Sequence, residues 1–512
     1  MIHRKARPGW KFQTSRGAPR LVMTLLGVSA MLATSVALRA DLIYFRNGGR
    51  IQAPAVAEGS TVTIDLVGET FTFQAEDIES RIPDPSPAQE WAARRKLLEG
   101  KPAAERFVEA WWALENGLVD EAVEELERIH RLAPEHEPTR RMIQAVDKLK
   151  APCDDPDFEA FQTSLGVASR IERGPHVLLL HQHPEAEAAE RVALLERVTT
   201  AYHLMFAGSG VPLRTPSRRL MFAWFADRLD YQAFLKNQEA APFASTRGYY
   251  HPTWNAVLAY DARSSELQRQ DRAGLAGRRD ELQAFRRTLE RLPARGRLRV
   301  ALAGERPRMV GRAEGGALID RLDRDVRRSE LLLEAERRAY DDGMAAHEMV
   351  HLLAADSGLL PRHDAFPIWL QEGLAMQFEV VRGGRWAGIG RPHDIRLNDW
   401  RRIQPPPPMD PLIRDRGFGQ GYRRDPYVQA WALVYFLRAR RGDQFVKFLD
   451  LLRSPRDHSE PAASHAELFS RAFGDDLGGL EMDWHAFLNE ARTPLERRAP
   501  HPTTAEEMRS RE

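Results

Sequence analysis

The most informative stretch of this chain is MAAHEMVH at residues 344–351, followed by PIWLQEGLA at residues 367–375. The first segment is apolar and helix-forming and contains no Pro, so it predicts a helix. Residues four apart lie one above the other on a helix, and His347 and His351 can therefore point both imidazoles at one cation. Glu348 follows His347 directly and comes within reach of a water held by that cation.

A third ligand for this cation is expected on a second helix. Hydrolytic zinc sites take three protein ligands and leave the fourth position to water. The second segment starts at Pro367, a good residue for a first helical turn, and carries Glu372 in an apolar run. We therefore predict a Zn²⁺ site built from His347, His351 and Glu372. The alternative is an amphipathic core helix that carries two surface histidines and a glutamate in a charged face.

These residues resemble the gluzincin branch of zinc metallopeptidases, which includes thermolysin and the aminopeptidases. The resemblance rests on His347, Glu348, His351 and the Glu-Gly-x-Ala segment at Glu372, and it extends from about residue 157 to residue 489. It is strongest to uncharacterised secreted gluzincin-like proteins, and it implies a zinc hydrolase. One position departs from the thermolysin pattern. Met376 stands where an Asp normally orients a ligand histidine, so that partner is unassigned.

The composition describes a soluble globular protein with a charged surface, because 43% of the 512 residues are hydrophobic and 29% are charged. The length accommodates about three domains. A formal net charge of +1 gives no reason to expect a nucleic-acid partner, and the basic residues are not gathered into one block apart from the N-terminus. Cys153 is the only cysteine, which excludes disulfides within the chain.

Residues 1–40 have the build of a secretory signal. Basic residues without any acid precede an uncharged apolar run over residues 21–38, which ends in small residues suited to cleavage. The alternative is an uncleaved membrane anchor, because about 18 apolar or small residues are just enough to span a bilayer. We favour cleavage, which predicts a secreted, periplasmic or cell-envelope protein. Only an uncleaved segment would attach the chain to a membrane.

Two modules are expected before the metal site. Residues 41–84 read as a small β module with apolar residues at alternate positions, and alone such a module would be marginal, so we expect it to dock on another part of the chain. Residues 85–152 are predicted to be helical, and residues 109–134 resemble one tetratricopeptide repeat. This segment could bind a protein partner, although an architectural role is favoured.

Residues 153–492 are predicted to form the peptidase domain, with a mixed sheet and a mainly helical C-terminal lobe. By the resemblance, the strand at residues 255–260 is an edge strand that accepts substrate backbone; an ordinary edge strand is the alternative. Residues 263–340 form a charged helical insertion, which is either a hairpin over the site or a solvated face. Asp341 or Asp342 is expected to cap the zinc helix. The polar tail at residues 493–512 is predicted to be disordered.

Together these features predict a multidomain α+β protein that acts as a zinc-dependent peptidase on peptide or protein substrates. No residue set for capturing a free amino terminus is visible, which favours an endopeptidase. Glu348 is expected to take the proton of the attacking water and pass it to the leaving amine. By the resemblance, Tyr427 donates a hydrogen bond to the oxyanion, with Tyr422 as the fallback and a packing role as the alternative for both.

Two other classes of function stay open at this point. One is a non-catalytic binding protein, in which the peptidase fold is a scaffold and the β and repeat modules are the working parts. The other is a zinc hydrolase that acts on a non-peptide amide. Measuring the zinc content and digesting a peptide library separate these classes from a peptidase.

Overall fold

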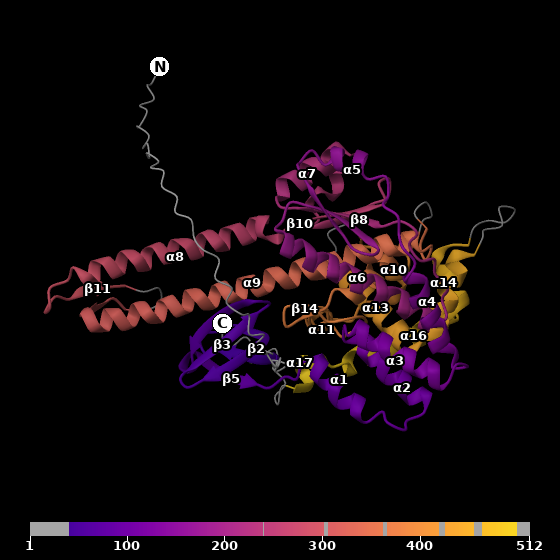
Figure 1. The fold of residues 1–512 in the computed structure, drawn as a ribbon, viewed down its shortest axis with the longest axis horizontal. Coiled ribbons are helices and arrows are strands. Elements are labelled where there is room, and N and C mark those ends of the chain that lie inside the picture. Colours follow the sequence, from indigo (N-terminus) through magenta and orange to yellow (C-terminus); the bar gives the residue numbers. More distant parts are fainter. Residues whose placement is uncertain are drawn as a thin grey trace, which may run out of the picture. The chain divides into compact units, whose positions relative to one another are not determined.

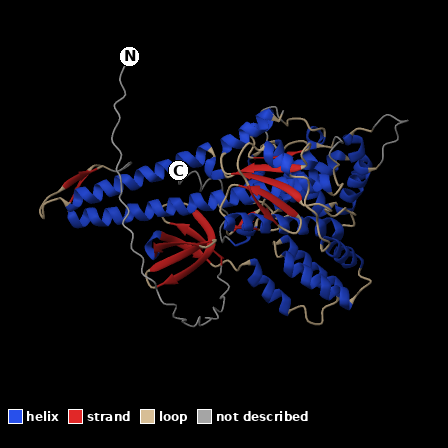
Figure 2. Cartoon of the chain, turned by 45° about the horizontal axis from the view of Figure 1, so that its top comes forward, coloured by secondary structure: helices blue, strands red, loops and turns tan. Residues whose placement is uncertain are grey.

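The computed structural model of the protein describes residues 40–238, 240–301, 306–361, 366–418, 425–454 and 463–498. The predicted signal or anchor at residues 1–40 lies outside this part of the chain except for Ala40, and so do residues 499–512 of the tail. The described chain is mixed α and β, mainly helical, with several small sheets (Figures 1 and 2). None of its described helices is long and apolar enough to cross a membrane.

The β module is a five-stranded antiparallel sheet in the order β4-β3-β2-β1-β5. In β3 the residues Val62, Ile64 and Leu66 are buried and those between them are half-exposed, as the alternating sequence predicts. The strands are β1 (Ala40–Phe45), β2 (Arg50–Glu58), β3 (Thr61–Leu66), β4 (Glu69–Gln74) and β5 (Ile78–Ile82), with the short helix η1 (Ala75–Asp77) before β5.

Four helices follow the β module. Ser86 caps the first of them, because its side chain accepts a hydrogen bond from the backbone of Gln89. They are α1 (Pro87–Lys96), α2 (Ala103–Glu115), α3 (Val119–Leu132) and α4 (Glu137–Leu149). Helices α2 and α3 pack on each other, and α4 packs on α3 and on α6 (Glu185–Gly208). The segment therefore shares one apolar core with the sheet domain.

The sheet domain is built on a mixed sheet in the order β6-β7-β8-β10-β9. Strands β7, β8 and β10 are parallel, whereas β6 and β9 run antiparallel to their neighbours. The strands are β6 (Arg170–Arg173), β7 (Val177–His181), β8 (Leu220–Phe225), β9 (Gly248–His251) and β10 (Ala256–Tyr260). All residues of β7, β8 and β10 are buried, which is the expected state of strands with both faces covered.

Alternate residues of these strands face two separate apolar cores. Leu179 and Phe222 belong to the large core, which also contains residues of α6 and of the end of α9 (Arg312–Asp356). Leu180 and Ala223 belong to a smaller core on the other face. The helices on this smaller side are α5 (Glu159–Ser164) and α7 (Arg228–Asn237). The turn η2 (Ala241–Ser245) joins α7 to β9, and the turn η3 (Ala262–Ser264) follows β10.

The charged insertion is a long antiparallel helical hairpin (Figure 1). Helix α8 (Glu266–Glu290) packs along α9, and the short sheet of β11 (Leu298–Val300) and β12 (Arg308–Val310) lies between them in sequence. The β module packs on the middle of α9, where its core includes Leu331. The sequence therefore correctly indicated that this small module docks on another part of the chain.

Helix α9 is continuous from the insertion into the stretch that carries His347, so the predicted cap at Asp341 or Asp342 is wrong. Asp341 lies inside the helix and is buried, with only 6% of its surface exposed. It forms an ion pair with Arg337, one turn earlier, at 2.8 Å. An ion pair between residues four apart supports helix continuation, whereas a capping residue would begin a helix.

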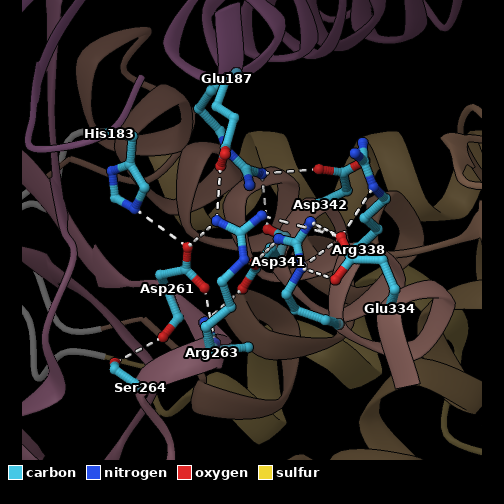
Figure 3. A network of polar contacts seen from close by, with 12 residues as sticks. His183, Glu187, Asp261, Arg263, Ser264, Glu334, Arg338, Asp341 and Asp342 are labelled. Atoms are coloured by element: carbon cyan, nitrogen blue, oxygen red, sulfur yellow. Dashed lines mark hydrogen bonds and ion pairs between the residues drawn. The ribbon is translucent and has the colours of Figure 1, made fainter. Parts of the chain in front are cut away.

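A buried polar network connects α9 to the sheet domain (Figure 3). Arg337 also pairs with Glu334 at 2.5 Å, and the backbone N–H of Ala262 donates to Asp341. Arg263, beside Asp341 in the figure, pairs with Glu187 of α6 at 2.9 Å. Burial and the charge of the neighbouring Asp261 together raise the pKa of Asp341 to about 6, although Arg191 and Arg337 lower it in part. The network fixes the part of α9 that precedes His347 and His351 against α6 and η3.

The rest of the chain is a mainly helical lobe. Its elements are α10 (Ile368–Ala375), η4 (Met376–Phe378), β13 (Val381–Arg382), β14 (Arg385–Trp386), α11 (Asp394–Arg402), α12 (Met409–Ile413), α13 (Pro426–Arg440), α14 (Gly442–Arg453), α15 (His465–Phe473), α16 (Leu477–Glu490) and α17 (Pro494–Arg498). The predicted disorder from residue 493 is wrong for the first residues of the tail. Thr493 is buried, and Glu496 forms an ion pair with Arg401.

Candidate functional site

Two histidines from the last part of α9 face each other. His347 and His351 are one helical turn apart, and their Nε2 atoms are 3.1 Å apart. Both rings lie in the interior, and burial lowers the pKa of His351 to about 4. A neutral imidazole is the form that binds a metal ion, so this environment favours the ligand form of His351.

Glu372 of α10 completes a triangle with these histidines. One of its carboxylate oxygens lies 3.3 Å from Nε2 of His347, and the other lies 3.6 Å from Nε2 of His351. A tetrahedral ion with bonds of about 2.0–2.1 Å separates its ligand atoms by about 3.3 Å. The two distances involve different oxygens of Glu372, and one ligand atom from each of the three residues lies within 4.8 Å of the others, so the side chains can converge on one ion.

Close packing of α10 on α13 positions Glu372. Gly373, the next residue, lies against α13 so tightly that a Cβ there would come within 2.5 Å of the carbonyl oxygen of Ala430 and 2.6 Å of the Val434 side chain. Only glycine allows this approach. The Glu-Gly pair in the sequence thus combines a candidate ligand with the residue that lets α10 approach α13.

Glu379, which the sequence prediction missed, holds the outer nitrogen of His347. The Nδ1–H of His347 donates to a Glu379 oxygen at 2.7 Å, and Arg396 pairs with the other oxygen at 3.1 Å. This hydrogen bond orients the ring so that Nε2 of His347 faces Glu372. Burial alone would raise the pKa of Glu379, but the hydrogen bond from His347 and the charges of His347 and Arg396 lower it to about 2.

The position of Glu379 explains why no partner was found at Met376. Met376 is fully buried in the core, and the carboxylate comes from three residues later, just after the short helix η4. The backbone of Glu379 lies against α9. A Cβ on Gly343 of that helix would come within 2.8 Å of the Glu379 carbonyl oxygen. A signal was present in the sequence, because Glu379 is the one charged residue in the run LAMQFEVV at residues 374–381.

Glu348 is buried beside the histidines and faces strand β9. A Cβ on Gly248 of β9 would come within 2.5 Å of the Glu348 side chain, so the glycine makes room for the carboxylate. Burial raises the pKa of Glu348 to about 7, although a hydrogen bond from the backbone of Tyr250 lowers it in part. Glu348 is thus placed between the histidine pair and the edge of the sheet.

The strand at residues 255–260 is not the edge strand, so this prediction is wrong. Strand β10 pairs with β8 on one side and with β9 on the other, and β9 has no second strand partner among the described residues. The reason is the tight hairpin between the two strands, which returns the chain inward at Asn255. The strand at this end of the sheet, beside Glu348, is therefore β9.

Tyr427 lies in the first turn of α13, the helix on which α10 packs, and 41% of its surface is exposed. Its ring packs edge-on against Phe418. Burial raises the pKa of Tyr427, and the negative charge of Glu372 raises it further, so the phenol lies in the field of that ligand. Tyr422, the fallback, lies outside the described residues.

A family model described as "Protein of unknown function (DUF1570)" matches residues 343–457. The match begins four residues before His347 and ends just after α14, so it contains His347, His351, Glu372 and Glu379. No curated protein and no solved structure matches the chain.

Proposed function

We propose that the protein is a zinc-dependent peptidase of the gluzincin type, with a zincin-like sheet domain and His347, His351 and Glu372 as the zinc ligands. The observation that carries this proposal is the triangle of ligand atoms beside a buried carboxylate. Two imidazoles and one carboxylate are ligands that suit Zn²⁺ in hydrolytic sites. Bound zinc lowers the pKa of a coordinated water toward neutrality and polarises the scissile carbonyl.

The residues around the ligands have separate tasks in this proposal. Glu379 keeps His347 in the tautomer whose Nε2 can bind the ion. Glu348 accepts a proton from the attacking water and passes it to the leaving amine. Tyr427 donates a hydrogen bond to the oxygen that becomes negative when the carbonyl carbon turns tetrahedral.

Strand β9 gives this site a way to hold a peptide. An extended substrate can pair with β9 by adding one more strand to the sheet. This pairing places a substrate backbone next to Glu348, because Gly248 of β9 lies against that side chain. The gluzincin resemblance implies such an edge strand near the zinc helix, and in this chain β9 takes the place that residues 255–260 were expected to fill.

The test separates metal binding from hydrolysis with two substitutions and a control. Glu348→Gln should retain zinc and lower peptide hydrolysis by about 10²–10⁴-fold, the usual contribution of a general base. His351→Ala should lose both. Glu336→Gln, at an exposed position of the same helix, is the matched control and should behave as the wild type.

Zinc content is measured by plasma emission, and hydrolysis by mapping cleavage sites in a peptide library. A Glu348→Gln protein as active as the wild type would refute the role of Glu348. A wild type that binds zinc but cleaves no peptide would instead favour the binding-scaffold reading or a non-peptide amide substrate. The same digest shows whether cleavage is internal or terminal. The secreted location and a protein partner for helices α1 to α4 stay predictions.

A further inference from the structure

The far end of the α8–α9 hairpin carries a concentrated positive charge. We define the hairpin tip as the described residues 286–301 and 306–312, which include the end of α8, both strands β11 and β12, and the first residue of α9. These residues include nine arginines and one glutamate, whereas the whole chain has a net charge of +1. The basic residues are therefore gathered in a second block besides the N-terminus, which corrects the expectation from the sequence.

All nine arginines are exposed: Arg286, Arg287, Arg291, Arg295, Arg297, Arg299, Arg306, Arg308 and Arg312. Arg308 lies 3.6 Å from Glu314, and Arg312 donates to backbone carbonyls at the end of α8. The other seven have no carboxylate within ion-pair distance among the residues that the structure describes. Their charges are thus directed at solvent.

The stem of the same hairpin differs from the tip. There Arg272 pairs with Glu334 at 3.2 Å and Arg279 pairs with Glu330 at 2.6 Å, in both cases from α8 across to α9. A solvated helical face usually mixes both signs of charge in this way. The tip departs from that pattern, so simple solvation does not account for its composition.

The side chains between the arginines indicate which kind of partner fits. The tip contains no aromatic residue, so it lacks the stacking platforms that single-stranded nucleic acids use. It carries aliphatic residues instead: Leu298 and Val300 are half-exposed, and Met309, opposite Arg299 in the β11–β12 pair, is 47% exposed. Arginines interspersed with exposed aliphatic side chains are typical of segments that bind anionic lipid surfaces.

We propose that the hairpin tip docks onto an anionic phospholipid surface. Each arginine near such a surface strengthens binding about fivefold. From Arg312 to His347, α9 extends by about 50 Å at 1.5 Å per residue, so the metal-ligand cluster stays well separated from the docked tip along the helix. This proposal is independent of the proposed function, because it involves none of the site residues.

The test compares four full-length proteins in vesicle co-sedimentation. They are the wild type, the tip variant R295Q/R297Q/R299Q, its charge-preserving counterpart R295K/R297K/R299K, and the control R131Q/R218Q/R471Q, which removes three exposed arginines elsewhere. The vesicles contain phosphatidylcholine alone or with about 30% phosphatidylglycerol. The N-terminal apolar segment is present in all four proteins, so it cannot produce a difference between them.

The wild type should bind the anionic vesicles and bind neutral vesicles only weakly. It should dissociate from the anionic vesicles as the salt concentration rises from about 0.1 to 0.5 M. The tip variant should lose about a hundredfold in partition coefficient, while the lysine variant and the control should bind as the wild type does. Equal melting temperatures exclude misfolding. Equal binding of the tip variant and the wild type would overturn the proposal. So would a wild type that binds no vesicle or prefers a DNA duplex at the same salt.

Discussion

The hydrogen bond from His347 to Glu379 yields the sharpest prediction, for the variant Glu379→Gln. The substitution keeps the shape of the side chain and one oxygen that can accept the Nδ1–H, but it removes the negative charge. The wild-type bond is short, at 2.7 Å, and the carboxylate also pairs with Arg396 at 3.1 Å. Hydrogen bonds to an ionised partner are about twice as strong as neutral ones, so the tautomer of His347 becomes less firmly held.

We expect Glu379→Gln to weaken Zn²⁺ binding by about 10–100-fold, the usual effect of removing a residue that orients a metal ligand. This corresponds to about 1.4–2.8 kcal/mol of binding free energy, since each tenfold change is 1.4 kcal/mol. The dissociation constant is measured by competition with a chromophoric chelator near neutral pH. Glu336→Gln, on an exposed part of α9, is the control for loss of one negative charge.

An unchanged dissociation constant for Glu379→Gln would refute this reasoning, provided that the metal-free variant melts as the wild type does. A lower melting temperature of the metal-free protein would show that Glu379 acts on the fold through Arg396. In that case Arg396→Gln should lower the melting temperature of the metal-free protein by a similar amount. A loss of affinity without a loss of stability is the result that assigns Glu379 to the metal site.

Three further predictions concern packing and charge. Gly373→Ala should destabilise the protein by about 1–3 kcal/mol in urea unfolding and weaken zinc binding, because the added methyl overpacks the α10–α13 contact. Arg337→Met should cost about 3–5 kcal/mol near pH 7.5, because it breaks the buried ion pair with Asp341; a cost below 1 kcal/mol would contradict this. Burial lowers the pKa of His176, but its hydrogen bond to Glu196 outweighs this and raises it. Its stabilising contribution is therefore full below about pH 6.5 and is lost as the pH rises through the folded-state pKa. The stability difference between wild type and His176→Gln should shrink from pH 6 to pH 9, and a constant difference would count against it.

Short-range periodicity made part of this structure readable from the sequence. The spacing of His347 and His351 already places both side chains on one face of a helix. The alternation of Val62, Ile64 and Leu66 similarly indicates a strand with one buried face. In both cases the pattern depends on neighbours within one turn or one strand, so no tertiary information is needed.

Features that depend on distant contacts were read wrongly or missed. In the sequence Asp341 resembles a helix cap, because aspartate serves both as a capping residue and as a partner in ion pairs. Only its burial and its ion pair with Arg337 in the structure show that it has the second role. The edge position of β9 follows from a hairpin turn and from the strand order, neither of which is encoded in the apolar run at residues 256–260. Glu379 reaches His347 only because the chain after α10 turns back onto α9 at Gly343.

The continuity of α9 explains what the β module contributes to the fold, which the sequence of the module alone does not indicate. A helix of 45 residues needs tertiary packing along its length, because helical propensity contributes little by itself. In the stem, α8 supplies ion pairs and a small apolar cluster around Leu275 and Val326. The β module contacts the same stretch of α9, where Leu331 is fully buried in its core and Arg324 pairs with Asp77 at 2.8 Å. The two together support the helix that joins the basic tip to the histidine pair, and the β module adds no residue to the cluster of His347, His351 and Glu372.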